Sequence, residues 1–298
     1  EYGQRQIMKP EEYGFIGLGQ MGGPMAGNIA ANGFALTVFD KAGTQGLAPE
    51  AAKLAADTPG VAQAADTVFL SVPDGNISLS VIDEIIACAD RRAGVIIDLS
   101  TIGPAAAREA DARCRAAGLI YIDAPVSGGQ AGARAGTITV MLAGPKDVVD
   151  AHHNVLMGFA KNPFHVGDEP GQGQAVKILN NFLSGTAMLA STEAMLYGIS
   201  QGVDMKTMLD VVNVSTGQNT ATLEKFPNRI LTETFDAGFA TALLTKDIKL
   251  FLENAQAAGT PTRVGQVIAD IWDETNETLP GSDFTLVYKL LRDGKVED

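Results

Sequence analysis

The sequence contains few of the residues that metal sites and disulfide frameworks need. Its 298 residues include two cysteines and three histidines. Cys88 and Cys114 lack a CxxC spacing and fall in segments that we expect to be helical. His152 and His153 lack a ligand spacing, and we expect both on a solvated face, so we predict no metal site. With no signal peptide pattern, this cysteine usage favours a cytoplasmic protein.

Positive charge and long apolar runs are also scarce. There are 22 basic and 35 acidic residues, giving a net charge of -13 and a pI near 4.6. Nucleic acids and anionic membranes need clustered positive charge, and no run reaches the roughly 18 apolar residues of a membrane span. We therefore expect a small-molecule partner. We interpret residues 1–7 as a tag remnant or disordered extension.

A glycine-rich motif follows the first apolar run. Residues 13–18 predict a strand, and Gly17, Gly19 and Gly22 come before a helical pattern. Gly17 permits a tight turn, Gly19 allows the backbone to approach a pyrophosphate, and Gly22 allows close helix packing. The amino terminus of the helix supplies amides and a positive dipole end. Strand, turn and helix together predict a dinucleotide site.

An acidic residue ends the next predicted strand. Asp40 follows residues 35–39, about twenty residues after the motif, where a carboxylate binds ribose hydroxyls. Its charge repels a 2'-phosphate, which favours NAD over NADP. Lys41 weakens this preference because its charge partly neutralises a phosphate, so NADP stays open as the less favoured cofactor.

Strand and helix patterns continue to alternate through the first half of the chain. Further strands are predicted at 67–72, 95–99, 119–123 and 137–142. This alternation indicates a doubly wound α/β sheet, whose strand ends line the cofactor crevice. Val72 and Pro73 lie at one such end and Thr101 at another. Thr101 is either a contact on the nicotinamide side or a helix cap.

A segment rich in small residues lies between two predicted strands. It spans 124–137 and contains Ser127, Gly128 and Gly129. Successive amides without side-chain bulk form a concave anion site, and Ser127 adds a hydroxyl donor. We expect a substrate carboxylate there. The alternative is a flexible linker.

Strand patterns stop after residues 164–166, and the rest of the chain indicates helices only. We expect them at 172–200, 204–214, 221–232, 241–258, 262–278 and 283–292. The sequence therefore predicts two domains, a Rossmann-type domain over 8–170 and an all-α domain over 171–298.

The first of these helices carries a lysine in apolar surroundings. Lys177, Asn181 and Ser184 share one helical face. Burial disfavours an ammonium ion and lowers its pKa, which makes Lys177 a candidate acid/base. The alternative is a lysine whose head reaches water past an apolar stem. Two later features, the polar segment 215–220 and the pair Lys246–Asp247, are more typical of surface positions.

Four blocks in this order resemble the β-hydroxyacid dehydrogenase family, which includes the 3-hydroxyisobutyrate dehydrogenases. The blocks are residues 14–28, 123–129 with 136–137, 171–177 with Asn181, and 246–247. The resemblance implies that the catalytic residues are Lys177 and Asn181. It implies that the substrate contacts are Ser127, Gly128, Gly129 and Phe239. With the motif analysis, it gives as cofactor contacts Gly17, Leu18, Gly19, Gln20, Met21, Gly22, Asp40, Val72, Pro73, Thr101 and Lys246.

The resemblance implies hydride transfer between NAD and the hydroxyl carbon of a small β-hydroxy carboxylic acid, with a lysine general acid/base. A catalytically silent NAD-binding scaffold and an imine reductase share the architecture but lack the lysine. A decarboxylating sugar-acid dehydrogenase has a much longer helical domain. The apolar long helix indicates subunit packing, and we expect a homodimer or homotetramer.

Overall fold

The computed structural model describes residues 12–294, so the interpretation of residues 1–7 falls outside the described part of the chain. The chain divides into two compact units, one ending at Lys177 and the other beginning at Ile178. The division falls inside helix α9 (Gln172–Ser200). The domain boundary expected before Gly171 remains a prediction.

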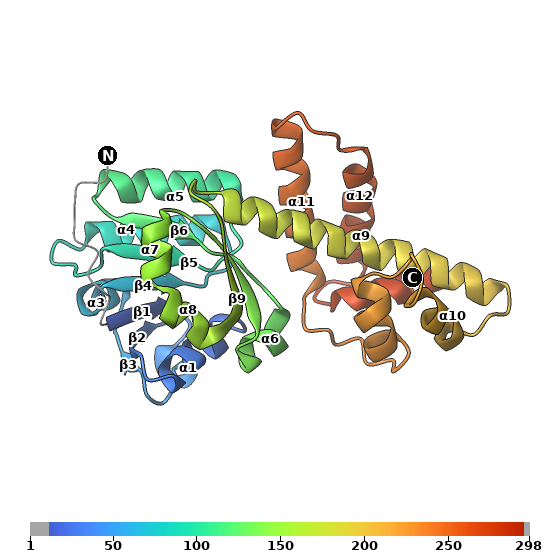
Figure 1. The fold of residues 1–298 in the computed structure, drawn as a ribbon, viewed down its shortest axis with the longest axis horizontal. Helices are drawn as coiled ribbons and strands as arrows, with labels where there is room; N and C mark the ends of the chain where they lie inside the picture. The colour runs from blue at the N-terminus through green and yellow to red at the C-terminus, as the bar shows by residue number, and fades with distance from the viewer. Residues whose placement is uncertain (1–11, 295–298) are drawn as a thin grey trace. The chain divides into compact units, whose positions relative to one another are not determined.

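The first unit contains a nine-stranded sheet (Figure 1). Its path runs β3-β2-β1-β4-β5-β6-β8-β7, and β9 pairs with β8. The first six strands of this path are parallel and have the Rossmann order, which confirms the predicted doubly wound α/β fold. The strands are β1 (Glu12–Ile16), β2 (Ala35–Phe39), β3 (Lys53–Leu54), β4 (Thr67–Leu70), β5 (Val95–Asp98), β6 (Ile120–Asp123), β7 (Val126–Ser127), β8 (Ile138–Ala143) and β9 (Ala160–Gly167).

Both faces of the sheet are buried. In β4, Val68 and Leu70 join one hydrophobic cluster and Phe69, between them, joins another. Successive side chains of a strand point to opposite faces, so a strand covered on both sides is apolar at every position. This explains the continuous apolar runs of the sequence.

Helices cover each face (Figure 1). Those in the cluster of Val68 are α3 (Thr58–Ala64), α4 (Gly75–Ala87) and α5 (Pro104–Ala116). Those in the cluster of Phe69 are α1 (Gly22–Ala31), α6 (Gly129–Ala135), α7 (Lys146–Ala151) and α8 (His153–Phe159). The short helix α2 (Thr44–Leu47) follows β2.

The regular structure of the second unit, within the described residues, consists of helices and one bridge between Ala240 and Asp283. This confirms the expected all-α half. Its core surrounds Trp272, whose side chain is fully buried. Its elements, besides α9, are α10 (Met205–Val212), the π-helix η1 (Ala221–Ile230), α11 (Thr241–Ala257), α12 (Arg263–Thr278), the 3₁₀ turn η2 (Phe284–Leu286) and α13 (Val287–Asp293). No helix within residues 12–294 is long and apolar enough to cross a membrane.

One sequence-based expectation about the first unit is wrong. His152 is buried, whereas only His153 is exposed. The ring of His152 lies between Thr67 Oγ1, at 2.7 Å from Nε2, and the Val148 carbonyl oxygen, at 2.7 Å from Nδ1. Burial lowers the pKa of His152, which favours the neutral ring. His152 is therefore a structural residue under the sheet.

Candidate active site

The glycine-rich turn between β1 and α1 cannot hold larger residues at two positions. Gly17 has a φ of 95°, and a Cβ added there would lie 2.1 Å from the Ser71 carbonyl oxygen. A Cβ on Gly22 would lie 1.9 Å from the Gly17 carbonyl oxygen. The tight turn expected at Gly17 and the close helix packing expected at Gly22 are both observed. The turn thus fixes where α1 begins, six residues after the last residue of β1.

The amino terminus of α1 suits an anionic group. Among the described residues, no side chain caps this helix, whereas Asp57 caps α3 and Asp74 caps α4. Gly19 is exposed, and a Cβ built on it would have no atom within 4 Å. Backbone amides at an uncapped helix start bind phosphate oxygens well. The residues present therefore fit the pyrophosphate of a dinucleotide, with Gln20 and Met21 in the same turn.

Asp40 is tied to the glycine-rich turn. Its Oδ2 accepts a 2.6 Å hydrogen bond from the Leu18 amide, and its Oδ1 accepts one of 2.7 Å from the Ala42 amide. The carboxylate is therefore fixed beside the turn at the end of β2, as ribose recognition requires. The link to Leu18 is not visible in the sequence. Lys41 is exposed.

The loops after β4 and β5 are joined to each other. The Val72 amide donates to Ser100 Oγ at 2.9 Å, and the Ser100 amide donates to Asp98 Oδ1 at 2.9 Å. Asp98 is fully buried and also accepts from Ser78 and Tyr121. Desolvation raises its pKa, and its hydrogen bonds oppose that rise. Asp98 thus anchors the loop on which Thr101 lies, and sequence reasoning missed this role.

Thr101 does not cap the following helix. Helix α5 begins at Pro104 after Gly103, and no described side chain caps it. Instead the backbone on both sides of Thr101 is bound by Gln174, whose side chain is fully buried. The capping interpretation is therefore wrong. A cofactor contact by Thr101 remains a proposal, as it does for Val72 and the exposed Pro73.

Helix α9 is capped by a buried carboxylate. Asp123, at the end of β6, accepts hydrogen bonds of 2.9 Å from the amides of Gly171 and Gln174. Desolvation raises the pKa of Asp123 to about 7, although these two amides oppose the rise. Lys177 follows in the next turn of the helix and is only 8% exposed. The sequence contains Asp123 in a motif but gives no sign that it caps a helix 48 residues away.

The segment around Ser127 is regular structure, so the alternative of a flexible linker is wrong, and the substrate-carboxylate site expected here remains a proposal. Ser127 pairs with Thr139 in the sheet, and α6 begins at Gly129. Gly128 and Gly129 have positive φ values of 129° and 62°, which turn the chain from strand into helix. A Cβ on Gly128 would lie 3.2 Å from the Ile138 side chain. The small residues therefore serve close packing as well as an open backbone.

In the second unit, Asn181 is paired with Asp247. Asn181 Nδ2 donates to Asp247 Oδ2 at 2.6 Å, and both residues are buried. Lys246 Nζ lies 3.4 Å from Asp247 Oδ1, and its side chain is 32% exposed. The expectation of a surface pair is therefore wrong for Asp247. In the segment 215–220, Asn219 Oδ1 accepts from the amides that open the π-helix η1, so Asn219 has a structural role.

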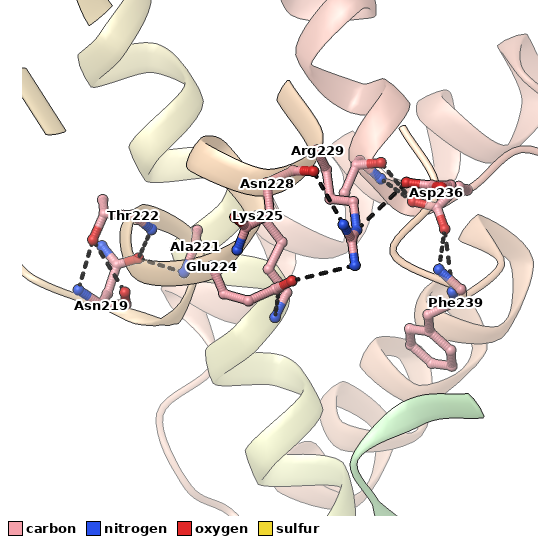
Figure 2. A network of polar contacts seen from close by, with 12 residues as sticks. Asn219, Ala221, Thr222, Glu224, Lys225, Asn228, Arg229, Asp236 and Phe239 are labelled. Atoms are coloured by element: carbon pink, nitrogen blue, oxygen red, sulfur yellow. Dashed lines mark hydrogen bonds and ion pairs between the residues drawn. The ribbon is translucent and has the colours of Figure 1, made fainter. Parts of the chain in front are cut away.

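Phe239 lies beside a charged turn (Figure 2). The amide of Phe239 donates to Asp283 Oδ2 at 3.2 Å, and its ring meets that of Phe284 edge-on at 6.1 Å. In the preceding segment, Arg229 Nε lies 3.5 Å from Asp236 Oδ1, and Arg229 Nη2 lies 3.8 Å from Glu224 Oε1. In Figure 2 the Phe239 ring points away from this network. The backbone of Phe239 is thus fixed while its ring is only partly buried.

Two family models match the chain. The NAD-binding domain of 6-phosphogluconate dehydrogenase matches residues 12–167, and the NAD-binding domain of NADP-dependent 3-hydroxyisobutyrate dehydrogenase matches residues 171–291. A 2-(hydroxymethyl)glutarate dehydrogenase of Eubacterium barkeri is 34% identical over 89% of each chain. A 3-hydroxyisobutyrate dehydrogenase of Pseudomonas aeruginosa is 34% identical over 93% of this chain and 97% of the relative.

A solved structure shows the same fold. It is that of Mycobacterium tuberculosis 3-hydroxyisobutyrate dehydrogenase with L-serine, at a TM-score of 0.86 and 30% identity, covering 95% of this chain and 99% of the other. The fold, the glycine turn and the named dehydrogenase relatives together define an NAD(P)-dependent hydroxyacid dehydrogenase. The chain belongs to the β-hydroxyacid dehydrogenase family, and NAD is its cofactor.

Proposed function

We propose that the protein moves a hydride between NAD and the hydroxyl-bearing carbon of a small β-hydroxy carboxylic acid, with Lys177 as the general acid/base. The observation that carries this proposal is a buried lysine in the second turn of α9, which begins against the carboxyl end of β6. Bound NAD supplies the hydride acceptor or donor. The named relatives act on acids that have a hydroxyl on the β carbon.

Lys177 handles the proton in this proposal. In oxidation its neutral amine takes the proton of the substrate hydroxyl, and in reduction its ammonium form donates that proton to the carbonyl oxygen. Without Lys177, the substrate oxygen would have to carry a negative charge, as an alkoxide, with no group to take up or supply its proton. Asn181, four residues on in the same helix, donates to or accepts from the reacting oxygen or a neighbouring hydroxyl.

The carboxylate of the substrate is held by the turn that follows β7. We assign this role to the Ser127 hydroxyl and to the backbone amides of Gly128 and Gly129, two residues with positive φ values and no side chains to block an anion. Phe239 is assigned to the apolar side of the substrate, and Lys246 to the cofactor. Fixing the carboxylate places the hydroxyl-bearing carbon at a set distance from the proton-transferring amine.

A panel of substrates tests the proposal. It contains 3-hydroxyisobutyrate, glycerate, L-threonate, L-serine and 2-(hydroxymethyl)glutarate, each with NAD or NADP as hydride acceptor, and tartronate semialdehyde with NADH or NADPH as hydride donor. We expect turnover of at least one member with NAD, followed by absorbance at 340 nm, and loss of turnover when its carboxylate is replaced by an amide. Tight NADH binding without any turnover would instead indicate a silent scaffold, and reduction of cyclic imines would indicate an imine reductase.

We also propose a homodimer or homotetramer. Helix α9 exposes apolar side chains outside the cores, including Leu183 at 60% and Tyr197 at 69%. Exposed apolar side chains of this size favour protein contacts. Light scattering should give a multiple of the 31.1 kDa chain, and Leu183→Glu should lower it. A cytoplasmic location remains a prediction.

A further inference from the structure

The side chain of Gln174 binds the backbone on both sides of Thr101. Its Oε1 accepts hydrogen bonds of 3.0 Å from the Ile102 amide and 3.1 Å from the Gly103 amide. Its Nε2 donates at 2.9 Å to the Ser100 carbonyl oxygen. The side chain is fully buried. One amide group therefore uses both its acceptor and its donor to fix a single loop.

The same loop is joined to its neighbour. Ser100 Oγ accepts the hydrogen bond of the Val72 amide at 2.9 Å. Val72 and Thr101 are the proposed cofactor contacts of the loops after β4 and β5. A shift of the Thr101 loop would therefore also shift the position of Val72.

Gln174 also belongs to helix α9, which carries Lys177. The amide of Gln174 donates to Asp123 Oδ2 at 2.9 Å. A Cβ on Gly173 would lie 2.3 Å from the Met141 carbonyl oxygen, so the first turn of α9 lies directly on the backbone of β8. This close packing leaves no space for the first turn of α9 to shift towards β8. Lys177 comes three residues after Gln174, about one helical turn further on.

We propose that Gln174 is a positioning residue that sets the distance between the loop of Thr101 and the amine of Lys177. The inference rests on the function proposed above. Gln174 itself contacts neither the cofactor nor the substrate in this scheme. It holds the loop on the nicotinamide side and the helix of the proton-transferring lysine in one arrangement. A misplacement of about 1 Å between reacting groups lowers rates by up to about 100-fold, so this distance matters for turnover more than for binding.

The first test replaces Gln174 with a side chain of similar length that cannot hydrogen-bond. In Gln174→Met, kcat should fall by roughly 30-fold to 100-fold, whereas the Kd for NADH should change by less than about threefold. The matched control is Gln172→Met. Gln172 is exposed in the same helical turn, and its Oε1 accepts from the Glu169 amide, away from the Thr101 loop. This control should turn over at the wild-type rate.

The second test uses Gln174→Glu, which adds a pH readout. A protonated glutamic acid reproduces the amide, since its carbonyl oxygen accepts from Ile102 and Gly103 while its hydroxyl donates to the Ser100 carbonyl. An ionised carboxylate has no proton to donate and repels that carbonyl. The ratio of kcat in Gln174→Glu to that in wild type should therefore fall as pH rises from 6 to 9. Asp98 and Asp123, at the ends of β5 and β6, are the neighbouring acids. Both are present in wild type and in Gln174→Glu, so their ionisation contributes to both terms of the ratio.

The outcomes separate this inference from the proposed function. Turnover near the wild-type rate in both Gln174 variants, with Lys177→Met inactive, would overturn the positioning role and leave the function standing. Wild-type protein that turns over no acid of the panel would overturn the function itself. A fall in kcat with NADH binding retained, together with the pH-dependent ratio in Gln174→Glu, would support the positioning role. If Gln174→Met does not fold, the pH ratio of Gln174→Glu decides alone.

Discussion

Asn181 donates a 2.6 Å hydrogen bond from its side-chain Nδ2 to Oδ2 of Asp247, 66 residues further along the chain. Because the acceptor is a carboxylate, this bond fixes which atom of the amide is the nitrogen and orients the group. Asp247 is 3% exposed, and Lys246 Nζ lies 3.4 Å from its Oδ1. Removal of Asp247 should therefore affect both the orientation of Asn181 and the stability of the second unit.

We predict that Asp247→Ala lowers kcat and the free energy of unfolding together. The loss of a buried hydrogen bond to a charged group corresponds to about 1.5–3 kcal/mol of stability. Asp247→Asn retains a carbonyl oxygen at this place and should recover most of the stability. The control is Asp270→Ala, since Asp270 is exposed and accepts a hydrogen bond from Gln266 in the same helix. Urea unfolding and steady-state kinetics measure the two effects. Equal kcat in Asp247→Ala and wild type would rule out orientation of a catalytic amide.

Lys177→Met should abolish turnover and leave cofactor binding intact. General acid/base catalysis contributes about 100-fold to 10,000-fold, so kcat should fall by at least 100-fold. The Kd for NADH, from fluorescence titration, should remain within about threefold of wild type, because the glycine turn and Asp40 are unchanged. Lys161→Met, at an exposed position of β9, is the control. Near-normal turnover of Lys177→Met would refute the assigned role.

Asp40→Ala should shift cofactor preference towards NADP for two reasons. The substitution removes a negative charge from the site of the 2'-phosphate, and it releases the amides of Leu18 and Ala42, which now donate to Asp40. We expect kcat/KM with NAD to fall by about 10-fold to 100-fold, the equivalent of losing charge-assisted hydrogen bonds of roughly 1.5–3 kcal/mol. The ratio of NADP to NAD activity should rise at least as much.

Lys41→Ala is a control that should change the cofactor preference in the opposite direction to Asp40→Ala. Lys41 is exposed beside Asp40, and its removal should lower residual activity with NADP without changing activity with NAD. An unchanged cofactor ratio in Asp40→Ala would show that the ribose lies elsewhere.

The elements of this fold were predictable because their signals are local. The apolar runs of the parallel strands, the glycine turn and the position of Asp40 each depend on a few consecutive residues. Helix α9 was also visible as one long apolar segment. Its bounds, Gln172–Ser200, agree with the expected 172–200.

The contacts that hold the candidate site, and the contact of the structural residue His152, were not predictable, because they join residues far apart in sequence. Gln174 meets Ile102 across 72 positions, and His152 meets Thr67 across 85. Both contacts follow from the order of strands in the sheet, which no single segment specifies. The segment of Gly128 was misread for a related reason, since glycine-rich sequences favour loops until a partner such as Ile138 packs against them.

The buried carboxyl of Asp123 should make stability depend on pH. Its pKa is raised from 3.8 to about 7, chiefly by desolvation. Between these pH values the unfolded chain has lost the proton that the native chain retains, so the native state binds more protons and stability falls as pH rises. The stabilising contribution is fully present below about pH 4 and is lost by about pH 7. At about 1.4 kcal/mol per unit, the change amounts to at most about 4 kcal/mol.

The measurement compares wild type with Asp123→Asn, which has no proton to lose at this position. Urea unfolding of both proteins from pH 4 to 8 gives the difference in the free energy of unfolding, in which the contributions of the remaining acids largely cancel. That difference, wild type minus variant, should decrease up to about pH 7 and be constant above it. A difference that increases with pH would mean that the amides of Gly171 and Gln174 stabilise the ionised carboxylate more than burial opposes it. In that case the native pKa of Asp123 would lie below its value in the unfolded chain.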